Sequence, residues 1–161
     1  MKELLCPAGN FEKMRAAILF GADAVYLASE RFGMRVAADN FTDAELCEAV
    51  CYAHERGVRV YVTVNTMPHT NEYKELEKYL IRLGEIGVDA LIISDVGVFT
   101  LAKKVIPDME IHISTQASTV SAQAALAWYN MGAKRVVLAR ELTLEEIKEI
   151  RQNTPSDLEI E

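Results

Sequence analysis

The sequence of 161 residues contains no apolar run that approaches the ~20 residues of a membrane-spanning helix. Its first seven residues turn polar too soon to form a secretory signal peptide. Only three cysteines are present, and an odd number without an export signal fits a reducing compartment better than a disulfide framework. These absences predict a cytoplasmic protein that makes no contact with a membrane.

Familiar catalytic motifs are absent as well. The sequence has no G-x-S-x-G, no H-E-x-x-H and no P-loop, and no G-x-G-x-x-G follows the first expected strand. The net charge of −7 argues against non-specific binding of nucleic acid, although a local basic patch could still hold an RNA. Because no linker or low-complexity tract interrupts residues 1–161, we expect a single domain.

What the sequence does contain is a repeated unit of helix, glycine and strand. Four helix-like segments end at a glycine that an apolar run follows at once, at Gly21, Gly57, Gly87 and Gly132. Glycine just past a helix adopts the left-handed conformation that other residues resist. A strand directly after such a residue is typical of the short connections in α/β proteins.

The expected elements alternate strictly. Strands are expected at about 3–6, 24–28, 58–65, 90–94, 110–116, 135–139 and 157–161, and helices at about 11–20, 42–56, 72–85, 98–104, 121–131 and 143–154. Capping boxes, Thr42 with Glu45 and Thr143 with Glu146, open two of the helices. This order predicts a parallel sheet, and the short strands favour a (β/α) barrel of the TIM type over a doubly wound sheet. A closed barrel usually takes about 250 residues, so we expect six βα units and a seventh strand of an incomplete barrel, the N-terminal fragment of a longer chain.

Segment 110–116 carries the strongest signal for a binding site. Isoleucines alternate there with polar residues, which places His112, Ser114 and Gln116 on one face. In a covered parallel sheet this polar face points into the barrel, where unpaired polar groups are costly unless they bind something. His112 is interpreted as a hydrogen-bonded core residue rather than a base. Gln116, at the end of the strand, is expected to bind rather than to catalyse.

Similar reasoning applies to the neighbouring strands. The expected lumen face also includes Ala24, Tyr26, Ala28, Tyr61 and Thr63, and the expected strand ends carry Asn65, Ser94, Asp95, Gln116, Arg140 and Glu141. Barrel active sites lie at the carboxyl ends of the strands. For any one of these residues, a satisfied structural role is the alternative to binding.

One expected helix carries a candidate metal-binding motif. Cys47, Cys51 and His54 follow one another at i, i+4 and i+7, a spacing compatible with metal or iron–sulfur ligation. Ala44 and Val50 belong to the same stripe, however, and cysteine is among the most frequently buried residues. We therefore expect this stripe to pack against the core.

Six sequence pieces occur in a recognisable order: Glu3–Asn10, Gly21–Tyr26, Met34–Phe41, Ala53–Gly57, Ser114–Gln116 and Arg140–Ile147. Together they resemble the N-terminal part of the barrel domain of peptidase family U32, the collagenase-like proteases, across essentially the whole chain. The resemblance implies a barrel protein of bacterial or archaeal type. The family name implies a hydrolase.

Better-understood members of this family imply another activity. They resemble oxygen-independent hydroxylation factors for tRNA, rRNA or a ubiquinone precursor, which use an iron–sulfur cluster and, for tRNA, prephenate. The resemblance places the cluster cysteines beyond Glu161, and Cys6 stands where the family more often has alanine. We therefore expect no cofactor or metal within residues 1–161 and no activity of this fragment alone.

Two pairs of residues acquire a role through the resemblance. Arg35 and Asn40 fall in the family pattern M-R-x-x-x-x-N-F, and Arg140 and Glu141 fall in the pattern R-E-L. A guanidinium can grip a carboxylate or a phosphate through two hydrogen bonds, whereas a salt bridge that closes the barrel mouth is the alternative for the second pair. The candidate substrate-binding residues are Arg35, Asn40, Asn65, Asp95, Gln116, Arg140 and Glu141, and no catalytic residue is assigned.

Three functions remain open. The first is part of an iron–sulfur-dependent hydroxylation factor that acts on tRNA, rRNA or a small carboxylic acid such as prephenate. The second is a collagenase-like peptidase, which the lack of a visible nucleophile–base pair or metal triad disfavours. The third is a non-catalytic barrel fragment that serves as an interaction module. Open barrel edges favour association, so a homodimer is expected.

Overall fold

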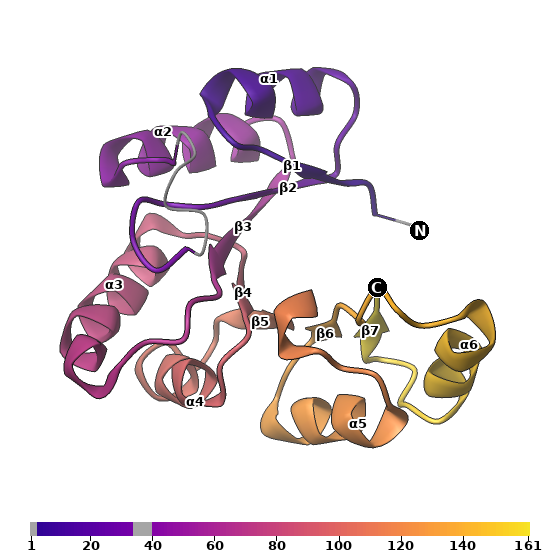
Figure 1. Cartoon of the computed structure of the whole chain (residues 1–161). Helices are drawn as coiled ribbons and strands as arrows, with labels where there is room; N and C mark the ends of the chain where they lie inside the picture. The colour runs from indigo at the N-terminus through magenta and orange to yellow at the C-terminus, as the bar shows by residue number, and fades with distance from the viewer. Residues whose placement is uncertain (1–2, 34–39) are drawn as a thin grey trace.

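The computed structural model describes residues 3–33 and 40–161. Its strands form one parallel sheet in which each strand pairs with the next along the chain: β1 (Leu5–Pro7), β2 (Ala24–Leu27), β3 (Arg59–Val64), β4 (Ala90–Ile93), β5 (Glu110–Ile113), β6 (Arg135–Val136) and β7 (Glu159–Ile160). The sheet curls into part of a barrel (Figure 1). This confirms the predicted fold class.

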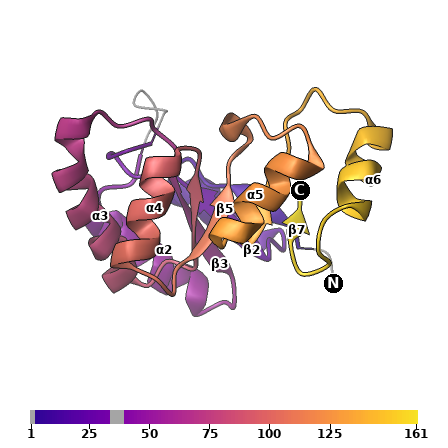
Figure 2. The same ribbon diagram turned by 90° about the horizontal axis from the view of Figure 1, so that it is seen from below.

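Helices alternate with the strands and cover the convex side of the curled sheet (Figures 1 and 2). They are α1 (Phe11–Leu19), α2 (Asp43–His54), α3 (Tyr73–Ile86), α4 (Val96–Val105), α5 (Ala122–Met131) and α6 (Leu144–Gln152), with short 3₁₀ turns η1 (Thr70–Glu72) and η2 (Thr115–Ala117). Within the described residues, β1 and β7 are not paired, so the curl stays open between them. No helix in this part of the chain has the length and apolarity needed to cross a membrane.

The two faces of the sheet pack differently because side chains alternate along each strand. Val60 and Val62 on β3 point outward into the main core under the helices. Tyr61, between them, points to the concave face and packs with Ala24 and Ala90. The predicted lumen face of β2 and β3 is therefore correct.

Most local signals have the predicted effect. The helices preceding β4 and β6 end at Gly87 (φ 82°) and Gly132 (φ 102°), which supply the left-handed caps. Both capping boxes form, and the hydroxyls of Thr42 and Thr143 accept hydrogen bonds from backbone N–H groups three residues on. The αβ connections thus follow from local chemistry.

Several strands are shorter than predicted, and for β5 and β6 the hydrogen bonds show how each strand ends. β5 ends at Ile113 because the hydroxyl of Ser114 accepts a hydrogen bond from the N–H of Gln116 and begins the turn η2. Gln116 therefore lies after the strand and not on it. β6 ends at Val136. The N–H groups of Val137 and Leu138 still donate to the carbonyls of Ile113 and Glu161, and that of Ala139 then donates to the carbonyl of Thr119 instead.

An ionic network centred on the buried Arg135 crosses the concave face at the end where the strands begin. Arg135, the first residue of β6, has a side chain only 7% exposed, and its Nη1 lies 2.7 Å from Glu3 Oε2 just before β1. The same guanidinium contacts Glu159 at 2.5 Å and Glu161 at 3.3 Å. Glu3 also accepts a 2.7 Å hydrogen bond from the Tyr61 hydroxyl and pairs with Arg59. We call Glu3, Arg59, Tyr61, Arg135, Glu159 and Glu161 the Arg135 network.

His112 lies beside this network. It is 1% exposed, its Nε2 is 2.9 Å from Glu110 Oε1, and its ring meets that of Tyr61 edge-on at 4.7 Å between centroids. The interpretation of His112 as a hydrogen-bonded core residue is confirmed.

Replacing Arg135 with alanine is expected to lower the free energy of unfolding by about 3 kcal/mol, because the change leaves the Glu3 carboxylate buried without its main partner. Urea denaturation of the purified chain measures this. Arg82→Ala is the matched control, since Arg82 pairs with Glu85 on the exposed face of α3 and such pairs contribute at most about 1 kcal/mol. Equal losses in the two variants would contradict the role of the Arg135 network.

The network also predicts a dependence on pH. Burial raises the pKa of Glu3, but hydrogen bonds from Tyr61 and Arg135 outweigh it, so that the folded-state pKa lies below the ordinary value. A carboxyl with a lowered folded-state pKa contributes stability above its unfolded pKa, and this contribution is lost as the pH falls through the folded value. We expect the free energy of unfolding to decrease from roughly pH 5 to pH 3, and Glu3→Gln to flatten that decrease. Glu12→Gln, at an exposed position of α1, should leave the pH dependence of the free energy of unfolding unchanged.

Candidate substrate-binding edge

Parallel strands bring their carboxyl ends to one edge of the sheet, and most of the predicted site residues lie there. Asn65 directly follows β3, Asp95 follows β4, and Gln116 lies in η2 after β5. Arg140 and Glu141 follow the end of β6. The fold therefore gathers these side chains at the end of the sheet opposite the Arg135 network. Arg35 lies outside the described residues.

The segment after β2 is fixed to the same edge. The backbone of Phe41 donates to the carbonyl of Ala28 at 3.0 Å, and its carbonyl accepts from Glu30 at 3.2 Å. Ser29 shares a buried 2.5 Å hydrogen bond with the hydroxyl of Tyr79 on α3, where burial raises the pKa of the phenol to about 12. Asn40, half-buried and adjacent to Phe41, is thereby placed at the edge.

Gly33 shows how closely this segment approaches the barrel interior. A Cβ on Gly33 would lie 3.3 Å from the Cβ of Ala28 and 3.8 Å from the hydroxyl of Thr63. The preceding Phe32 adopts a φ of 54°, which is rare for a bulky residue. Its ring packs against Tyr79 at 5.5 Å, a contact that helps to hold this conformation. Residues 28–33 thus lie against the ends of β2 and β3.

Asp95 has a structural role that the sequence analysis did not assign. Its Oδ1 accepts a 2.9 Å hydrogen bond from the N–H of Val98 and so caps α4, which begins at Val96 rather than at the predicted residue 98. The hydroxyl of Tyr73 donates to the same oxygen at 3.3 Å. The close approach of Tyr73 requires glycine at position 97, where a Cβ would lie 2.1 Å from the phenol oxygen. Aspartate before an apolar helix was the signal that could have revealed this cap.

Gln116, Arg140 and Glu141 remain available to a ligand. All three are exposed, and neither Arg140 nor Glu141 forms an ion pair within the described residues. The alternative of a salt bridge between these two residues across the barrel mouth is therefore not what the structure shows. An exposed guanidinium beside an exposed carboxylate can bind a polar ligand through both charges.

Buried hydroxyls add to the polarity of this edge. Thr66, Ser94 and Thr119 follow β3, β4 and β5 in turn, and their hydroxyl oxygens are buried without a hydrogen-bond partner among the described residues. A buried hydroxyl that stays without a hydrogen-bond partner lowers the stability of the fold by about 1–3 kcal/mol. Unsatisfied polar groups are typical of sites where binding, rather than stability, sets the sequence.

The metal motif on α2 does not assemble. His54 Nε2 lies 2.8 Å from Asp89 Oδ2, and Cys47 Sγ accepts a hydrogen bond of 3.6 Å from the guanidinium of Arg82. Within the described residues, no group of three or more His, Cys, Asp or Glu side chains could hold a metal ion, so these residues do not fit an iron–sulfur cluster. The expectation that the stripe packs inward is wrong for Ala44, Cys51 and His54, which are exposed. The buried face of α2 carries Leu46, Ala49, Val50 and Ala53 instead.

A curled parallel sheet that is covered by helices and carries polar groups at its carboxyl edge defines a (β/α)-barrel protein. The sequence profile of peptidase family U32 matches residues 9–161, and the chain belongs to this family. The solved structure of the U32 peptidase Mk0906 superposes with a TM-score of 0.82, over 99% of this chain and 68% of that one. Its 16% sequence identity makes this a likeness of fold.

Two curated relatives from Escherichia coli (strain K12) are much more similar in sequence. The tRNA hydroxylation protein P is 44% identical over 159 residues, which cover 99% of this chain and 35% of that protein. The 23S rRNA 5-hydroxycytidine C2501 synthase is 40% identical, over 98% of this chain and 23% of that protein. The chain thus spans about a third of the first relative and a quarter of the second.

The capping role of Asp95 can be tested by substitution. Asp95→Ala is expected to lower the free energy of unfolding by about 1 kcal/mol, because α4 loses its cap, whereas Asp95→Asn should lower it by only a few tenths, because asparagine caps as well. Urea denaturation measures both. A loss in Asp95→Asn as large as in Asp95→Ala would show that the carboxylate charge, rather than the cap, stabilises this helix.

Proposed function

We propose that this chain is the substrate-binding part of a protein that hydroxylates RNA. One observation carries the proposal: 44% identity to the tRNA hydroxylation protein P extends over 99% of the chain. The identity of 40% to an rRNA hydroxycytidine synthase supports RNA as the substrate class rather than one particular tRNA. Such a protein acts on its substrates in the cytoplasm.

The carboxyl edge supplies the groups that this role requires. Single-stranded RNA is recognised through hydrogen bonds to the edges of unstacked bases, and the amides of Asn65 and Gln116 can both donate and accept such bonds. The exposed guanidinium of Arg140 is suited to a phosphate of the RNA or to the carboxylate of a small acid such as prephenate. These residues bind and orient. An iron–sulfur cluster, if the complete protein uses one, takes its ligands from outside the residues described in this structure, and no step assigned to this chain passes through it.

The peptidase alternative draws its support from the family description and from the solved relative that bears this name. Cysteine and serine peptidases require a nucleophile within hydrogen-bonding reach of a base. In the described part of the chain, His54 is bonded to Asp89 and His112 to Glu110, and no serine or cysteine is hydrogen-bonded to a histidine. The contacts of these histidines favour hydroxylation over proteolysis.

Deletion of the gene in its source organism is expected to remove one hydroxylated nucleoside from tRNA or rRNA, as measured by mass spectrometry of digested RNA. Restoring the gene with Gln116→Ala or Arg140→Ala should leave that nucleoside reduced at least roughly tenfold, as for a lost hydrogen bond to a charged or polar substrate group. Arg82→Ala, on the exposed face of α3, should restore it fully. Unchanged nucleosides after deletion, together with hydrolysis of collagen peptides by the purified protein, would favour the peptidase.

A further inference from the structure

Two serines occupy matching positions on neighbouring strands at the carboxyl edge. β4 and β5 pair Ile93 with Ile113, so Ser94 and Ser114, each one residue further along, lie side by side. The N–H of Ser114 donates to the carbonyl of Ile93 at 2.8 Å and continues the pairing to this level. Because neighbouring strands are about 4.8 Å apart, one small group of a ligand can contact both side chains.

Both serines belong to the concave face of the sheet. Side chains alternate along a strand, so Ser94 lies on the same side as Ile92, which packs with Tyr61 on the concave face. Ser114 lies on the same side as His112, whose ring meets that of Tyr61 there. The pair therefore lies at the carboxyl end of the barrel interior, which is the end where barrel enzymes bind their substrates.

Neither serine hydroxyl donates a hydrogen bond within the described residues. The oxygen of Ser94 is buried without a partner, so it does not bond the neighbouring Ser114. The oxygen of Ser114 accepts a hydrogen bond from the N–H of Gln116, which leaves the hydroxyl proton unused. The two serines are only 6% and 5% exposed, and groups buried to this degree are nearly always paired. Rotation about a single bond carries such a hydroxyl between staggered positions, so both can turn to a ligand on the concave face.

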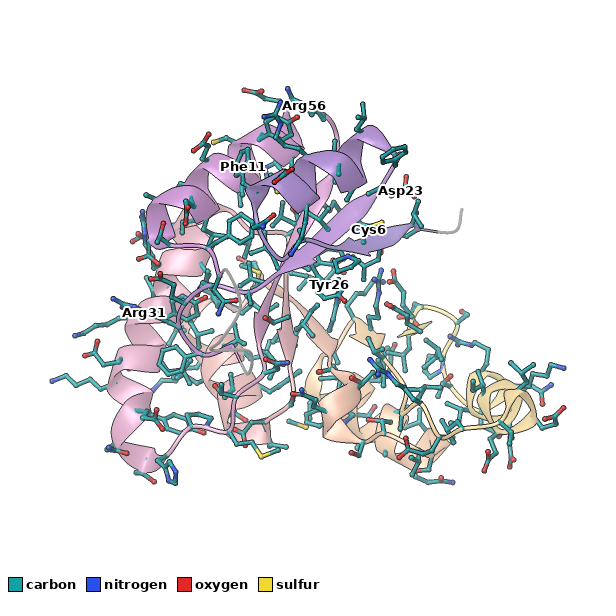
Figure 3. All side chains as sticks on the ribbon, turned by 45° about the horizontal axis from the view of Figure 1, so that its top comes forward. Cys6, Phe11, Asp23, Tyr26, Arg31 and Arg56 are labelled. Carbon is teal, nitrogen blue, oxygen red and sulfur yellow. The ribbon has the colours of Figure 1, made fainter. Side chains whose placement is uncertain are left out.

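The surroundings of the two serines are apolar. Met67, Val96 and Val120 follow β3, β4 and β5 in turn, and they are 71%, 52% and 49% exposed. Further down the concave face lie the half-buried side chains of Ile92 and Tyr26, the latter labelled on β2 in Figure 3. A ligand that reaches the serines therefore meets apolar groups on its way and hydroxyls at its end. A flat ring with polar atoms along one edge fits this arrangement.

The charge next to the serines favours a neutral ring over an anion. Asp95 directly follows Ser94, and its carboxylate is held in place by the N–H of Val98 and the hydroxyl of Tyr73. Like charges repel, so a phosphate or a carboxylate is disfavoured beside this aspartate. The exposed guanidinium of Arg140 is the better place for such a group.

We infer, building on the proposed function, that Ser94 and Ser114 bind the polar edge of the nucleobase that becomes hydroxylated, after this base has turned out of its RNA strand. Enzymes that modify a base read its edge through hydrogen bonds and hold its faces between apolar side chains. A hydroxyl both donates and accepts, so it can pair with a keto group or with an amino group. The serines bind and position the base.

Ser94→Ala tests the inference, because Ser114 also begins the turn η2 and its replacement would disturb the fold. The protein is produced from its complete gene. The hydroxyl of Ser94 has no partner in the described fold, so the urea midpoint of Ser94→Ala should be no lower than that of the wild type. The rate at which the hydroxylated nucleoside forms should fall roughly three- to tenfold, as for one lost hydrogen bond to the substrate. Ser156→Ala, at an exposed position before β7, is the matched control and should change neither quantity.

Binding of a short RNA shows whether the base itself is read. The RNA spans the hydroxylated position, which the gene deletion identifies, and a second RNA lacks the base at that position. Ser94→Ala should weaken binding of the intact RNA roughly three- to tenfold and leave binding of the abasic RNA unchanged. Equal weakening of both RNAs overturns the inference, because the serine then acts on the structure and not on the base.

Three further results overturn the inference. Wild-type rates and affinities in Ser94→Ala would mean that water alone meets the hydroxyl. A lower urea midpoint in Ser94→Ala would mean that another part of the protein pairs with it. If deletion of the gene leaves every nucleoside unchanged, the proposed function fails and this inference fails with it. A nucleoside that is lost on deletion but made normally by Ser94→Ala refutes the role of the serines and leaves the proposed function standing.

Discussion

The guanidinium of Arg135 is the interaction on which the shape of this molecule depends. A parallel sheet in sequential order curls but, in the described residues, does not join β7 back to β1. Arg135 spans the concave face instead, linking Glu3 before β1 to Glu159 and Glu161 at the other end of the sheet. A buried charge is tolerated only when several partners share it, and three carboxylates do so here. The curl thus depends on ion pairing as well as on hydrogen bonding between strands.

The position of this network separates stability from binding. Arg59, Arg135 and Glu159 are the first residues of their strands, so the network occupies the amino-terminal end of the concave face. The carboxyl end is left to exposed or unpaired polar groups such as Gln116, Arg140 and the hydroxyl of Ser94. Barrel enzymes divide their two ends in the same way. The network fixes the strands whose far ends carry the proposed site.

The alternation of helices and strands could be predicted from short-range sequence signals, whereas contacts between residues far apart in the sequence could not. Glycine caps and capping boxes depend on residues a few positions apart, and they marked nearly every helix correctly. The Arg135 network joins residues from opposite ends of the chain, and no spacing in a sequence encodes such a meeting. The strand predicted over 110–116 ends early for a local reason. The Ser114 hydroxyl accepts a hydrogen bond from the N–H of Gln116, and this bond starts a turn in place of further strand pairing. The binding edge was predicted from topology, but the capping role of Asp95 was missed.

The net charge of −7 is less of an obstacle to RNA binding than it first suggests. Several carboxylates are already engaged: Glu3, Glu159 and Glu161 surround Arg135, Glu45 and Glu146 close capping boxes, and Asp95 caps α4. Their charges are partly compensated by a guanidinium or by backbone N–H groups at helix starts. Glu45, Glu146 and Asp95 are compensated in this way at helix starts, whereas Glu3, Glu159 and Glu161 lie with Arg135 at the opposite end of the sheet. Under the proposed function, the amides of Asn65 and Gln116 would supply hydrogen bonds to exposed base edges at this edge, beside the guanidinium of Arg140.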